Sequence, residues 1–536
     1  MMTMPLLGFI LIPIVSGLMM YIRPHNWVKK VTVLIQVLLL FCSIDCLQKL
    51  HTVPEVIEHL SVYPLPVGMT LRLDRLSQVT LLLNNGLFLF MTIFAYREKY
   101  MNKLFIFLFL SLQGMINGIF LANDFFNVYI LIEVATITVS ILIMFKKDSR
   151  SMYDGMIYLL VNMTAMAFFL LGVGYLYKYF GVLDFTTIGQ YLGQVTNAKP
   201  LMMPLALLLT GVSLKAALMP LFSWLPKAHS TASAPSVISS ILSGIFVKTG
   251  VYLFIRLQTM FHPIVDLNGE FIWMGVITAV AGFTFAIAQK DIKLILAYHT
   301  ISQIGLIMIG LNIGSIEGFY GAIYHILTHG VFKALLFLVA GLCVEMYQIR
   351  DITQMKGLWH HSKAMSIALI VAILSITGAP FFSGGYSKYL ISHSYTGFGG
   401  DMLFQFLSMG TMISFMKFFK MIFTKPNCII DRKVAWNEQA VLLTMALVCM
   451  VFGTFGDQVV AEVVHYEGYF PIYKQVGKLL TYGATYIVAY GLYKVAIENR
   501  RWTKYIMRIE LGYNSISLSI VSFFFLTAVY LNWVIM

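Results

Sequence analysis

The chain contains about 16 apolar runs that are each long enough to cross a lipid bilayer as a helix. Such a helix needs about 20 apolar residues, and it suits the bilayer because each backbone N–H and C=O finds a partner within the segment. Only 11% of the 536 residues are charged, against about 25% in soluble domains. The sequence therefore predicts an all-α polytopic membrane protein without a soluble domain, with runs beginning near residues 4, 31, 76, 104, 124, 153, 201, 235, 271, 292, 319, 364, 402, 439, 479 and 516.

Lysine and arginine residues are unevenly shared among the loops that join these runs. About 25 of them follow odd-numbered runs and about 8 follow even-numbered runs. Because basic loops stay in the cytoplasm, the sequence predicts a multi-pass protein of the inner (cytoplasmic) membrane with both termini outside. This topology also explains the net charge of +13, which is scattered along the chain and forms no basic stripe for nucleic acid.

The stretch from Gly211 to Arg256 combines charge with helix-breaking residues at membrane depth. Lys215 lies inside one apolar run, Pro220 interrupts that run, and Lys248 lies in the next run. Proline removes a backbone hydrogen bond and clashes with the preceding helical turn. Broken backbone survives in a bilayer only where it is buried in protein or lines a wet cavity. A charge beside such a break therefore predicts ion handling.

Glu133 is a carboxylate near the middle of another apolar run. Burial alone would neutralise it, whereas a lysine within about 4–6 Å would keep it charged. Lys215 is the candidate partner. The two residues could take part in ion transfer, or they could form a static ion pair between packed helices.

His325, His329 and Lys333 follow one another at four-residue spacing in the eleventh run. This spacing places the three side chains on one helix face over about 12 Å. Imidazole can donate and accept a proton near neutral pH, and a desolvated lysine can exchange one, so the face can relay protons. Two alternatives are a metal site, for which H-x3-H is ligand spacing but no third ligand is nearby in sequence, and histidines that only hydrogen-bond neighbouring helices.

A second break lies in the twelfth run, where Pro380 stands among glycines and Lys388 follows. Two interrupted helices in corresponding places, each with a lysine, are typical of a transporter built from inverted repeats. The repeats would be runs 4–8 and 9–13. His299, in a polar stretch of the tenth run, is a candidate for the same polar axis.

Other parts of the sequence narrow the chemistry. The five cysteines show no CxxC and no paired metal spacing, so any redox centre would have to be in a partner. The external segment Val62 to Leu73 is expected to form a hairpin. The last basic loop, Glu498 to Glu510, holds Arg500 and Arg508 in helical spacing with other basic residues; it is either an interfacial anchor or a docking site for a partner.

Seven motifs follow one another along the chain. They are KAALMP at Lys215 to Pro220, WLPKAH at Trp224 to His229, LSG at Leu242 to Gly244, KTG at Lys248 to Gly250, KDIKLILAY at Lys290 to Tyr298, HGVFKALLF at His329 to Phe337 and GGYSK at Gly384 to Lys388. In this order they resemble the antiporter-like subunits shared by respiratory complex I (NADH-quinone oxidoreductase), membrane-bound energy-converting hydrogenases and Mrp sodium/proton antiporters. The resemblance covers about residues 76–423. The sequence departs from the family at Phe222, where a histidine is frequent, and at Phe381, where a second proline is frequent.

The resemblance implies a 14-helix core of two inverted five-helix repeats with broken helices 7 and 12, plus about two C-terminal helices. It divides the chain into 1–75, a core at 76–424 with repeats at about 104–257 and 268–424, and 425–536. The implied roles are a gating pair (Glu133, Lys215), a relay lysine (Lys248), central conductors (His325, His329, Lys333) and a terminal charge (Lys388). His229 and His299 are further relay candidates beside this set.

The resemblance further implies an ion-translocating subunit, with protons as the favoured ion, that has no cofactor of its own. Half-channels from the two sides would meet along the polar axis. Its partners would be other membrane subunits and a peripheral redox arm, in which any iron–sulfur, flavin or nickel centres would lie. An Mrp-type sodium/proton antiporter subunit without electron transfer is the alternative, and a structural spacer is a third possibility. The sequence does not choose between H⁺ and Na⁺.

Overall fold

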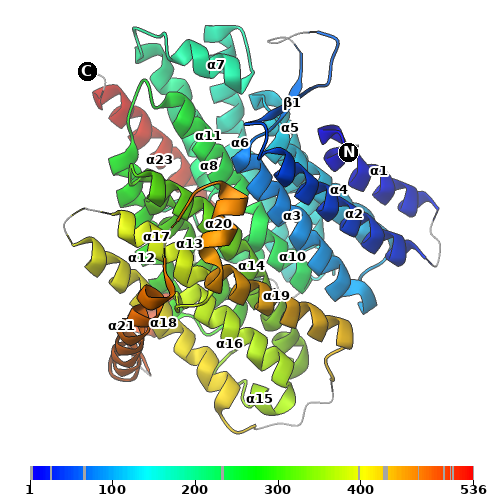
Figure 1. The fold of residues 1–536 in the computed structure, drawn as a ribbon, viewed down its shortest axis with the longest axis vertical. Coiled ribbons are helices and arrows are strands. Elements are labelled where there is room, and N and C mark those ends of the chain that lie inside the picture. Colours follow the sequence, from blue (N-terminus) through cyan, green and yellow to red (C-terminus); the bar gives the residue numbers. More distant parts are fainter. Residues whose placement is uncertain are drawn as a thin grey trace. The chain divides into compact units, whose positions relative to one another are not determined.

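The computed structural model describes all residues except 1–3, 24–26, 64–67, 231–233, 396, 398, 427–431, 469, 499–500, 508, 510–511 and 535–536. The described part of the chain is mostly helical (Figure 1). It forms two compact units. The first unit consists of Met1–Ala234, Ile245–Leu267 and Leu511–Met536, and the second of Pro235–Gly244 and Asn268–Glu510.

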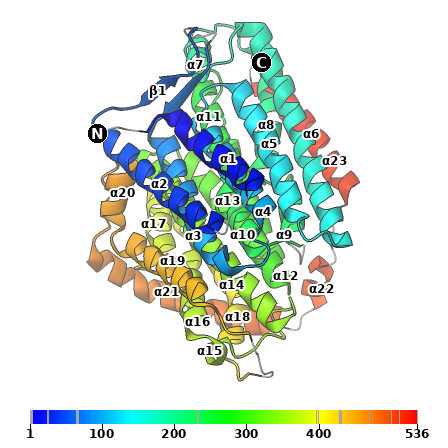
Figure 2. The ribbon, with the colours of Figure 1, turned by 90° about the vertical axis from the view of Figure 1, so that its right-hand side faces the viewer.

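The first unit is a bundle of long helices. They are α1 (Leu6–Ile22), α2 (Val28–Lys49), α3 (Arg75–Phe94, extended by the 3-10 turn η1, Ala95–Arg97), α4 (Lys103–Leu121), α5 (Phe125–Ile143), α6 (Ser149–Phe180), α7 (Phe185–Leu192), α8 (Met202–Lys215, preceded by the 3-10 turn η2, Lys199–Leu201), α9 (Trp224–Ser230), α11 (Lys248–Phe261) and α23 (Tyr513–Val534). Helices α1, α4, α5 and α6 pack against one another in that order (Figure 2). The last helix, α23, packs against α8 and α6.

The second unit is organised around α14 (Ile316–Tyr347), which is buried along most of its length. The other helices are α10 (Ser236–Ile241), α12 (Asn268–Ala288), α13 (Ile292–Asn312), α15 (Leu358–His361), α16 (Lys363–Thr377), α17 (Ser383–Ser394), α18 (Gly400–Phe423), α19 (Trp436–Thr454), α20 (Gly456–Val464), α21 (Ile472–Leu492, continued by the π-helical η4, Tyr493–Ile497) and α22 (Arg501–Met507). Helix α14 packs against α10, α13, α16, α17 and α19. A further π-helical turn, η3 (Leu242–Phe246), lies where the chain passes between the units.

Among the described residues, twelve helices are long and apolar enough to cross a membrane, and α1 and α16 are shorter apolar helices. The all-α polytopic fold predicted from the sequence is confirmed. Four of the 16 predicted runs are not among these long spans. The run near residue 4 forms the 17-residue α1, and the runs near residues 201 and 364 are each divided by a break. The run near residue 479 forms α21, which carries Lys474, Gln475 and Lys478 in its first two turns.

Polar residues in the loops fix where many helices begin. Their side chains accept a hydrogen bond from a backbone N–H of the first turn, which has no partner within the helix. Such caps begin α3, α4, α5, α6, α7, α13, α14 and α16, at Asp74, Asn102, Asp124, Asp148, Asp184, Asp291, Ser315 and Ser362. Charged and polar loop residues therefore set the ends of the apolar spans.

The predicted hairpin is present, but its first strand lies earlier in the chain than expected. Strand β1 (Val56–His59) pairs antiparallel with β2 (Thr70–Leu73), with Val56 opposite Leu73. Pro64 and Pro66, which fall between the two strands in the sequence, lie outside the described residues. Leu71 and Leu73 of β2 are buried in a cluster with residues of α1, α2, α3 and α4. The hairpin is thereby anchored to the helices of the first unit.

Each unit contains the same backbone clasp. The clasp is an isolated antiparallel β-bridge between the residue before one helix and the loop that follows the next helix. In the first unit it pairs Asp124, before α5, with Asp184, after α6. In the second unit it pairs Asp291, before α13, with Asp351, after α14. The paired aspartates are 60 residues apart in both units. The hydrogen bonds on either side also correspond, running from Phe125 N to Leu183 O, Phe185 N to Asn123 O, Ile292 N to Arg350 O and Ile352 N to Lys290 O. Such agreement is expected of an internal repeat; the predicted repeat boundaries remain predictions.

Candidate functional site

The first break lies between α8 and α9. Helix α8 ends at Lys215, and the backbone then loses helical form for eight residues that include Pro220. The indole Nε1 of Trp224 donates to Leu214 O at 2.7 Å, which gives one of the terminal carbonyls of α8 a partner. The broken helix predicted here is confirmed. Lys215 lies at its C-terminal end, where the helix dipole favours a cation.

Lys215 is completely buried, and neutral groups surround its ammonium. Its Nζ donates to Thr136 Oγ1 of α5 at 2.9 Å and to Asn162 Oδ1 of α6 at 3.3 Å. The same nitrogen lies 4.4 Å from the centre of the Phe246 ring, a distance typical of a cation–π contact. The polar partners of Lys215 are therefore a hydroxyl and an amide from two other spans.

Glu133 lies on α5, one turn before Thr136, and is partly buried. Its charge and that of Lys215 interact. Within the described chain, however, no ion pair joins the carboxylate to the ammonium, and the direct contact of Lys215 on α5 is Thr136. The predicted partners thus lie in the same region of the first unit, with a gap between their charged groups.

Lys248 is the first residue of α11 and is fully buried. The first turn of α11 packs closely against the first break. A Cβ added at Gly250 would lie 2.6 Å from Lys215 C and still closer to Ala216 N. Glycine is the residue that permits such a close approach of two backbones. The other candidate in this unit, His229, is buried on α9.

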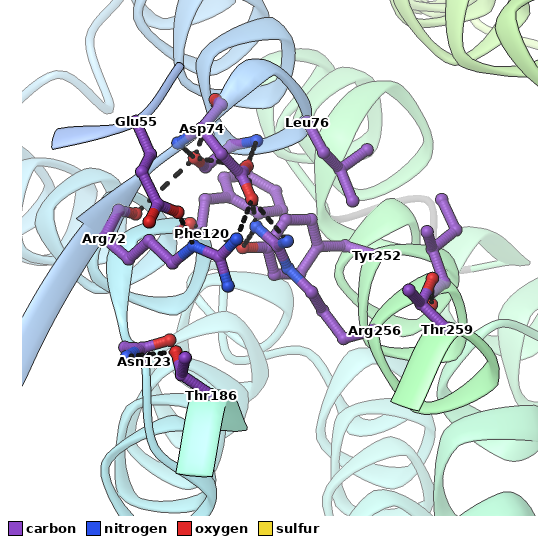
Figure 3. A network of polar contacts seen from close by, with 12 residues as sticks. Glu55, Arg72, Asp74, Leu76, Phe120, Asn123, Thr186, Tyr252, Arg256 and Thr259 are labelled. Atoms are coloured by element: carbon purple, nitrogen blue, oxygen red, sulfur yellow. Dashed lines mark hydrogen bonds and ion pairs between the residues drawn. The ribbon is translucent and has the colours of Figure 1, made fainter. Parts of the chain in front are cut away.

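The opposite end of α11 is tied to the start of α3 by a charged network (Figure 3). Arg256 donates to both carboxylate oxygens of Asp74, at 2.6 and 2.8 Å, and to the hydroxyl of Tyr252 at 2.8 Å. Tyr252 in turn donates to Phe120 O of α4 at 2.7 Å. Burial of Asp74 opposes its charge, but Arg256, the Ser77 N–H and Arg72 together outweigh burial and hold the pKa of that carboxyl well below its usual range.

In the second unit, His299 and Lys333 connect α13 to its neighbours. The His299 ring shares a hydrogen bond with Ser414 Oγ of α18 and stacks on Phe415, with ring centres 4.8 Å apart. The Lys333 ammonium donates to Leu296 O, one turn before His299 on α13. Both side chains are fully buried. Lys333 of α14 therefore contacts α13 one turn from His299, so two predicted relay residues lie in the same region.

His325 is the first residue of the predicted relay face of α14. Its Nδ1 shares a hydrogen bond with Ser387 Oγ of α17 at 2.8 Å, and its Nε2 shares one with Gln303 Oε1 of α13 at 3.2 Å. The His325 and His329 rings stack with centres 5.9 Å apart and planes at 18°. The predicted face is thus formed, and His325 joins it to two other helices.

The second break lies between α16 and α17, as predicted. It contains Gly378 and Phe381 in left-handed backbone conformations, with φ of 87° and 68°. Lys388 of α17 reaches back across the break and donates from Nζ to Ile376 O at 2.7 Å. Close approach requires glycine here as well, since a Cβ at Gly384 would clash with Ser375 O. Lys388 therefore contacts the C-terminal end of α16, the helix that precedes the break.

A cavity of about 320 Å³ opens at this second break. Its lining includes Gln303, which contacts His325, and Lys388, together with Pro380 and Asp401. Helix α21 adds Lys478 and Tyr482, and the Tyr482 hydroxyl shares a 2.8 Å hydrogen bond with Thr377 at the end of α16. Polar groups therefore continue from the α14 histidine to the broken helix and onward into an open space.

No three histidine, cysteine or acidic side chains come together in metal-binding geometry within the described part of the chain. The pair His325 and His329 thus gains no third ligand of these types from another described helix. The observed partners of His325 are hydroxyl and amide groups. These contacts agree with either a hydrogen-bonding or a relay role.

Sequence reasoning missed the neutral partners of the charged residues. Asn162 is a lone amide in an apolar run, and this signal could have identified it. Thr136, Ser387 and Ser414 gave no such signal, because hydroxyl residues in helices usually bond a carbonyl of the preceding turn. Thr136 does so with Ile132 O while it also accepts from Lys215.

Residues 122–414 match the protein family described as "NADH:quinone oxidoreductase/Mrp antiporter, TM". The chain belongs to this family. The match extends across both breaks and includes every predicted site residue. The resemblance inferred from the sequence motifs is therefore confirmed, and the protein is an antiporter-like membrane subunit.

Named relatives of this antiporter-like protein occur in two kinds of complex. A subunit of the Na⁺/H⁺ antiporter of Alkalihalophilus pseudofirmus is 29% identical over 392 residues, which cover 71% of this chain and 78% of that protein. A subunit of the NADH-quinone oxidoreductase of Desulforudis audaxviator is 27% identical over 384 residues, covering 67% of this chain and 75% of that protein.

Solved structures share the fold of the antiporter-like subunit. A chain of the Mrp complex from a Dietzia species superposes with a TM-score of 0.78 at 20% identity, over 94% of this chain and 99% of that one. A chain of an archaeal membrane-bound sulfane sulfur reductase superposes with a TM-score of 0.79 at 22% identity, over 90% and 99%. At these identities the likeness concerns the fold.

Proposed function

We propose that this antiporter-like subunit translocates protons across the membrane as part of a multi-subunit complex. The observation that carries the proposal is the series of exchangeable groups in the second unit. It includes Lys333, which donates to Leu296 O one turn from His299, then His325 and Gln303, and the cavity that contains Lys388. Such groups pass protons by alternately donating and accepting them.

Protons fit this series better than sodium ions do. The groups that line it are mainly lysines, histidines and neutral hydroxyls or amides, with Asp401 as the carboxylate at the cavity. A sodium ion would be repelled by each ammonium group in a medium of low dielectric constant. A proton instead binds to the amine or imidazole itself, so the same residues that repel sodium carry it.

In the first unit, Lys215 would act as the residue that senses and transmits charge. Its contacts with Thr136 and Asn162 are neutral, and Glu133 is near without direct contact. A change in the charge of Glu133 would therefore alter the proton affinity of Lys215 without first breaking an ion pair. Lys248, next to the segment that packs on the break, would be the following acceptor.

The driving force would be a redox reaction in partner subunits. The relative in NADH-quinone oxidoreductase and the fold shared with a sulfane sulfur reductase support this assignment. Partners would then include further membrane subunits and a peripheral arm with iron–sulfur, flavin or nickel centres. The alternative, an Mrp-type Na⁺/H⁺ antiporter without electron transfer, is supported by the relative in the Na⁺/H⁺ antiporter. In both cases we place the protein in the cytoplasmic membrane with its basic loops inside and its termini outside.

The test of translocation uses the intact complex, purified through a tag on this chain and reconstituted into vesicles. We expect Lys215→Ala, Glu133→Ala and Lys388→Ala to abolish coupled proton movement, measured with a pH-sensitive dye, while the subunit composition stays that of the unmodified complex. Proton movement at the unmodified rate in a correctly assembled Lys215→Ala complex would contradict the assignment.

The nature of the complex can be tested in the same preparation. Mass spectrometry of the co-purified subunits, with iron, nickel and flavin analysis, is expected to identify a redox arm. If only small membrane subunits without iron, nickel or flavin are found, the Mrp-type alternative replaces the redox assignment, and sodium/proton exchange becomes the activity to measure.

A further inference from the structure

A second cavity in the second unit, of about 360 Å³, lies where several spans end. Its walls come from the C-terminal ends of α12 and α18, the segment before α13, the loop after α14, and α22 with the residues preceding it. The chain turns at this level between α12 and α13, and α14 returns to it, so these segments mark one interface of the bilayer with water. The cavity is separate from the one that contains Lys388.

The charge of this cavity is strongly positive. Its lining contains one carboxylate, that of Glu498, and five lysines, which are Lys290, Lys356, Lys417, Lys420 and Lys504. Glu498 is paired with Lys420. Lys417 donates to Ile287 O and Gln289 O at 2.6 Å each, at the C-terminal end of α12. Two of the lysines thus already have protein partners.

The other three lysines have no acidic partner in the part of the chain that the structure describes. Among the described residues, none forms an ion pair with Lys290, Lys356 or Lys504. Like charges that share one cavity repel one another, and the repulsion is relieved when an anion binds between them. The geometry therefore favours an anionic ligand with several acceptor oxygens.

The uncharged part of the lining has two kinds of surface. Thr353, Thr424 and Thr503 contribute hydroxyl-bearing side chains, and the apolar wall includes Ile352, Met421 and other apolar residues. The neighbouring Trp502 is 40% exposed on α22, and tryptophan is enriched at the level of lipid headgroups. The cavity can therefore hold a phosphate group beside apolar atoms at the depth of the membrane surface.

We propose that this cavity binds the phosphate of an anionic phospholipid headgroup, with the apolar wall contacting the adjoining glycerol and acyl region. Basic pockets between spans on the face that carries the basic loops suit such headgroups. Free phosphate shares the charge but would leave the apolar wall exposed to water, so the lipid fits the lining better. The assignment stands independently of the proposed proton translocation.

The test compares two triple variants of the intact complex in an uncharged detergent. The first is Lys290→Gln/Lys356→Gln/Lys504→Gln, which removes the lysines without an acidic partner. The control is Lys363→Gln/Lys425→Gln/Lys494→Gln, which makes the same change in net charge at exposed lysines outside the cavity. The probes are dioctanoyl phosphatidylglycerol, dioctanoyl phosphatidylcholine and inorganic phosphate, and binding is measured by titration calorimetry.

We expect saturable binding of phosphatidylglycerol to weaken by about tenfold or more in the first variant and to change little in the control. Phosphatidylcholine should bind poorly to both, and inorganic phosphate should fail to displace the lipid. Equal phosphatidylglycerol affinity in the two triple variants would overturn the site. Displacement by inorganic phosphate at comparable concentration would replace the lipid with a soluble anion. Elution volume and thermal midpoint in phosphatidylcholine verify that both variants are folded.

Discussion

Lys215 is held in the protein interior by neutral hydrogen-bond partners and an aromatic ring. A hydrogen bond to a charged group contributes about 1.5–3 kcal/mol. The Thr136 hydroxyl therefore helps to position the Lys215 ammonium, although the hydroxyl does not itself ionise at neutral pH. We regard Thr136 as a positioning residue that acts through Lys215.

Thr136→Val is expected to lower proton translocation by about tenfold or more, because the Lys215 ammonium loses its 2.9 Å partner. Thr136→Ser retains the hydroxyl and should restore most of the rate. Thr138→Val is the matched control, since Thr138 lies on the same helix and bonds Val134 O and Met115 Sδ without contacting Lys215. The rate is measured with the reconstituted complex. Equal rates for the two valine variants would show that the Thr136 hydroxyl has no role.

At the scale of single elements, the close packing of α11 on the first break is a distinctive feature. Backbone meets backbone at Gly250, and the broken end of α8 cannot move away without uncovering Lys215. Overpacking at such a contact typically costs about 1–3 kcal/mol.

Gly250→Ala is expected to lower the thermal midpoint in detergent, because the added methyl group meets the backbone of Lys215 and Ala216. Gly174→Ala in α6 is the control, since nothing lies within 4 Å of a Cβ there. In a helix interior that change should raise stability by up to about 1 kcal/mol. Opposite shifts of the two midpoints are predicted, and a shared direction would contradict the packing argument.

The pair of Asp74 with Arg256 ties α3 to α11 and makes stability depend on pH. The folded-state pKa of Asp74 lies well below that of an unfolded aspartate, about 3.9. The pair therefore stabilises the protein fully above that value, and the contribution falls as the pH drops toward the folded-state pKa.

Asp74→Asn should lower stability by about 2 kcal/mol at neutral pH, while asparagine still caps α3. The difference in thermal midpoint between the unmodified protein and the variant should shrink as the pH is lowered below about 4. Thermal unfolding in detergent across this pH range provides the measurement. A difference that stays constant down to the lowest pH would show that the charge of Asp74 is not the cause.

Much of the element-level architecture could be predicted from the sequence, because lysines and prolines stand out in apolar runs. Pro220 and Pro380 marked the breaks, and Lys215 and Lys388 were placed beside them. The groups that Lys215 and His325 contact were not predicted. The end of α8 at Lys215 was not predicted, because it depends on Trp224 reaching Leu214 O across the break. Hydroxyl partners were missed for the same reason: their role depends on helices that are distant in sequence.

At the scale of the whole molecule, the described chain comprises two units with the same aspartate clasp, and its last helix belongs to the first unit. Helix α23 packs on α8, and the Phe168 and Phe524 rings lie 5.3 Å apart. Helix α23 therefore covers part of the surface of α8 and α6.

Truncation before Tyr513 is expected to lower the thermal midpoint by several degrees and to reduce translocation, because α8 loses a packing neighbour. Leu518→Ala/Leu526→Ala/Val529→Ala is the control, since these side chains are largely exposed on α23. Thermal unfolding and the vesicle assay supply the measurements. A truncated protein that behaves like the unmodified one would show that α23 does not support α8.

The return of α23 also has a consequence for biosynthesis. Helix α8 is synthesised about 300 residues before α23, an interval of about 15–60 s at ordinary rates of translation. During that interval the side of α8 that α23 will cover must face lipid or an insertion factor. Nascent and finished chains therefore differ in a surface that the quality-control machinery of the membrane can distinguish.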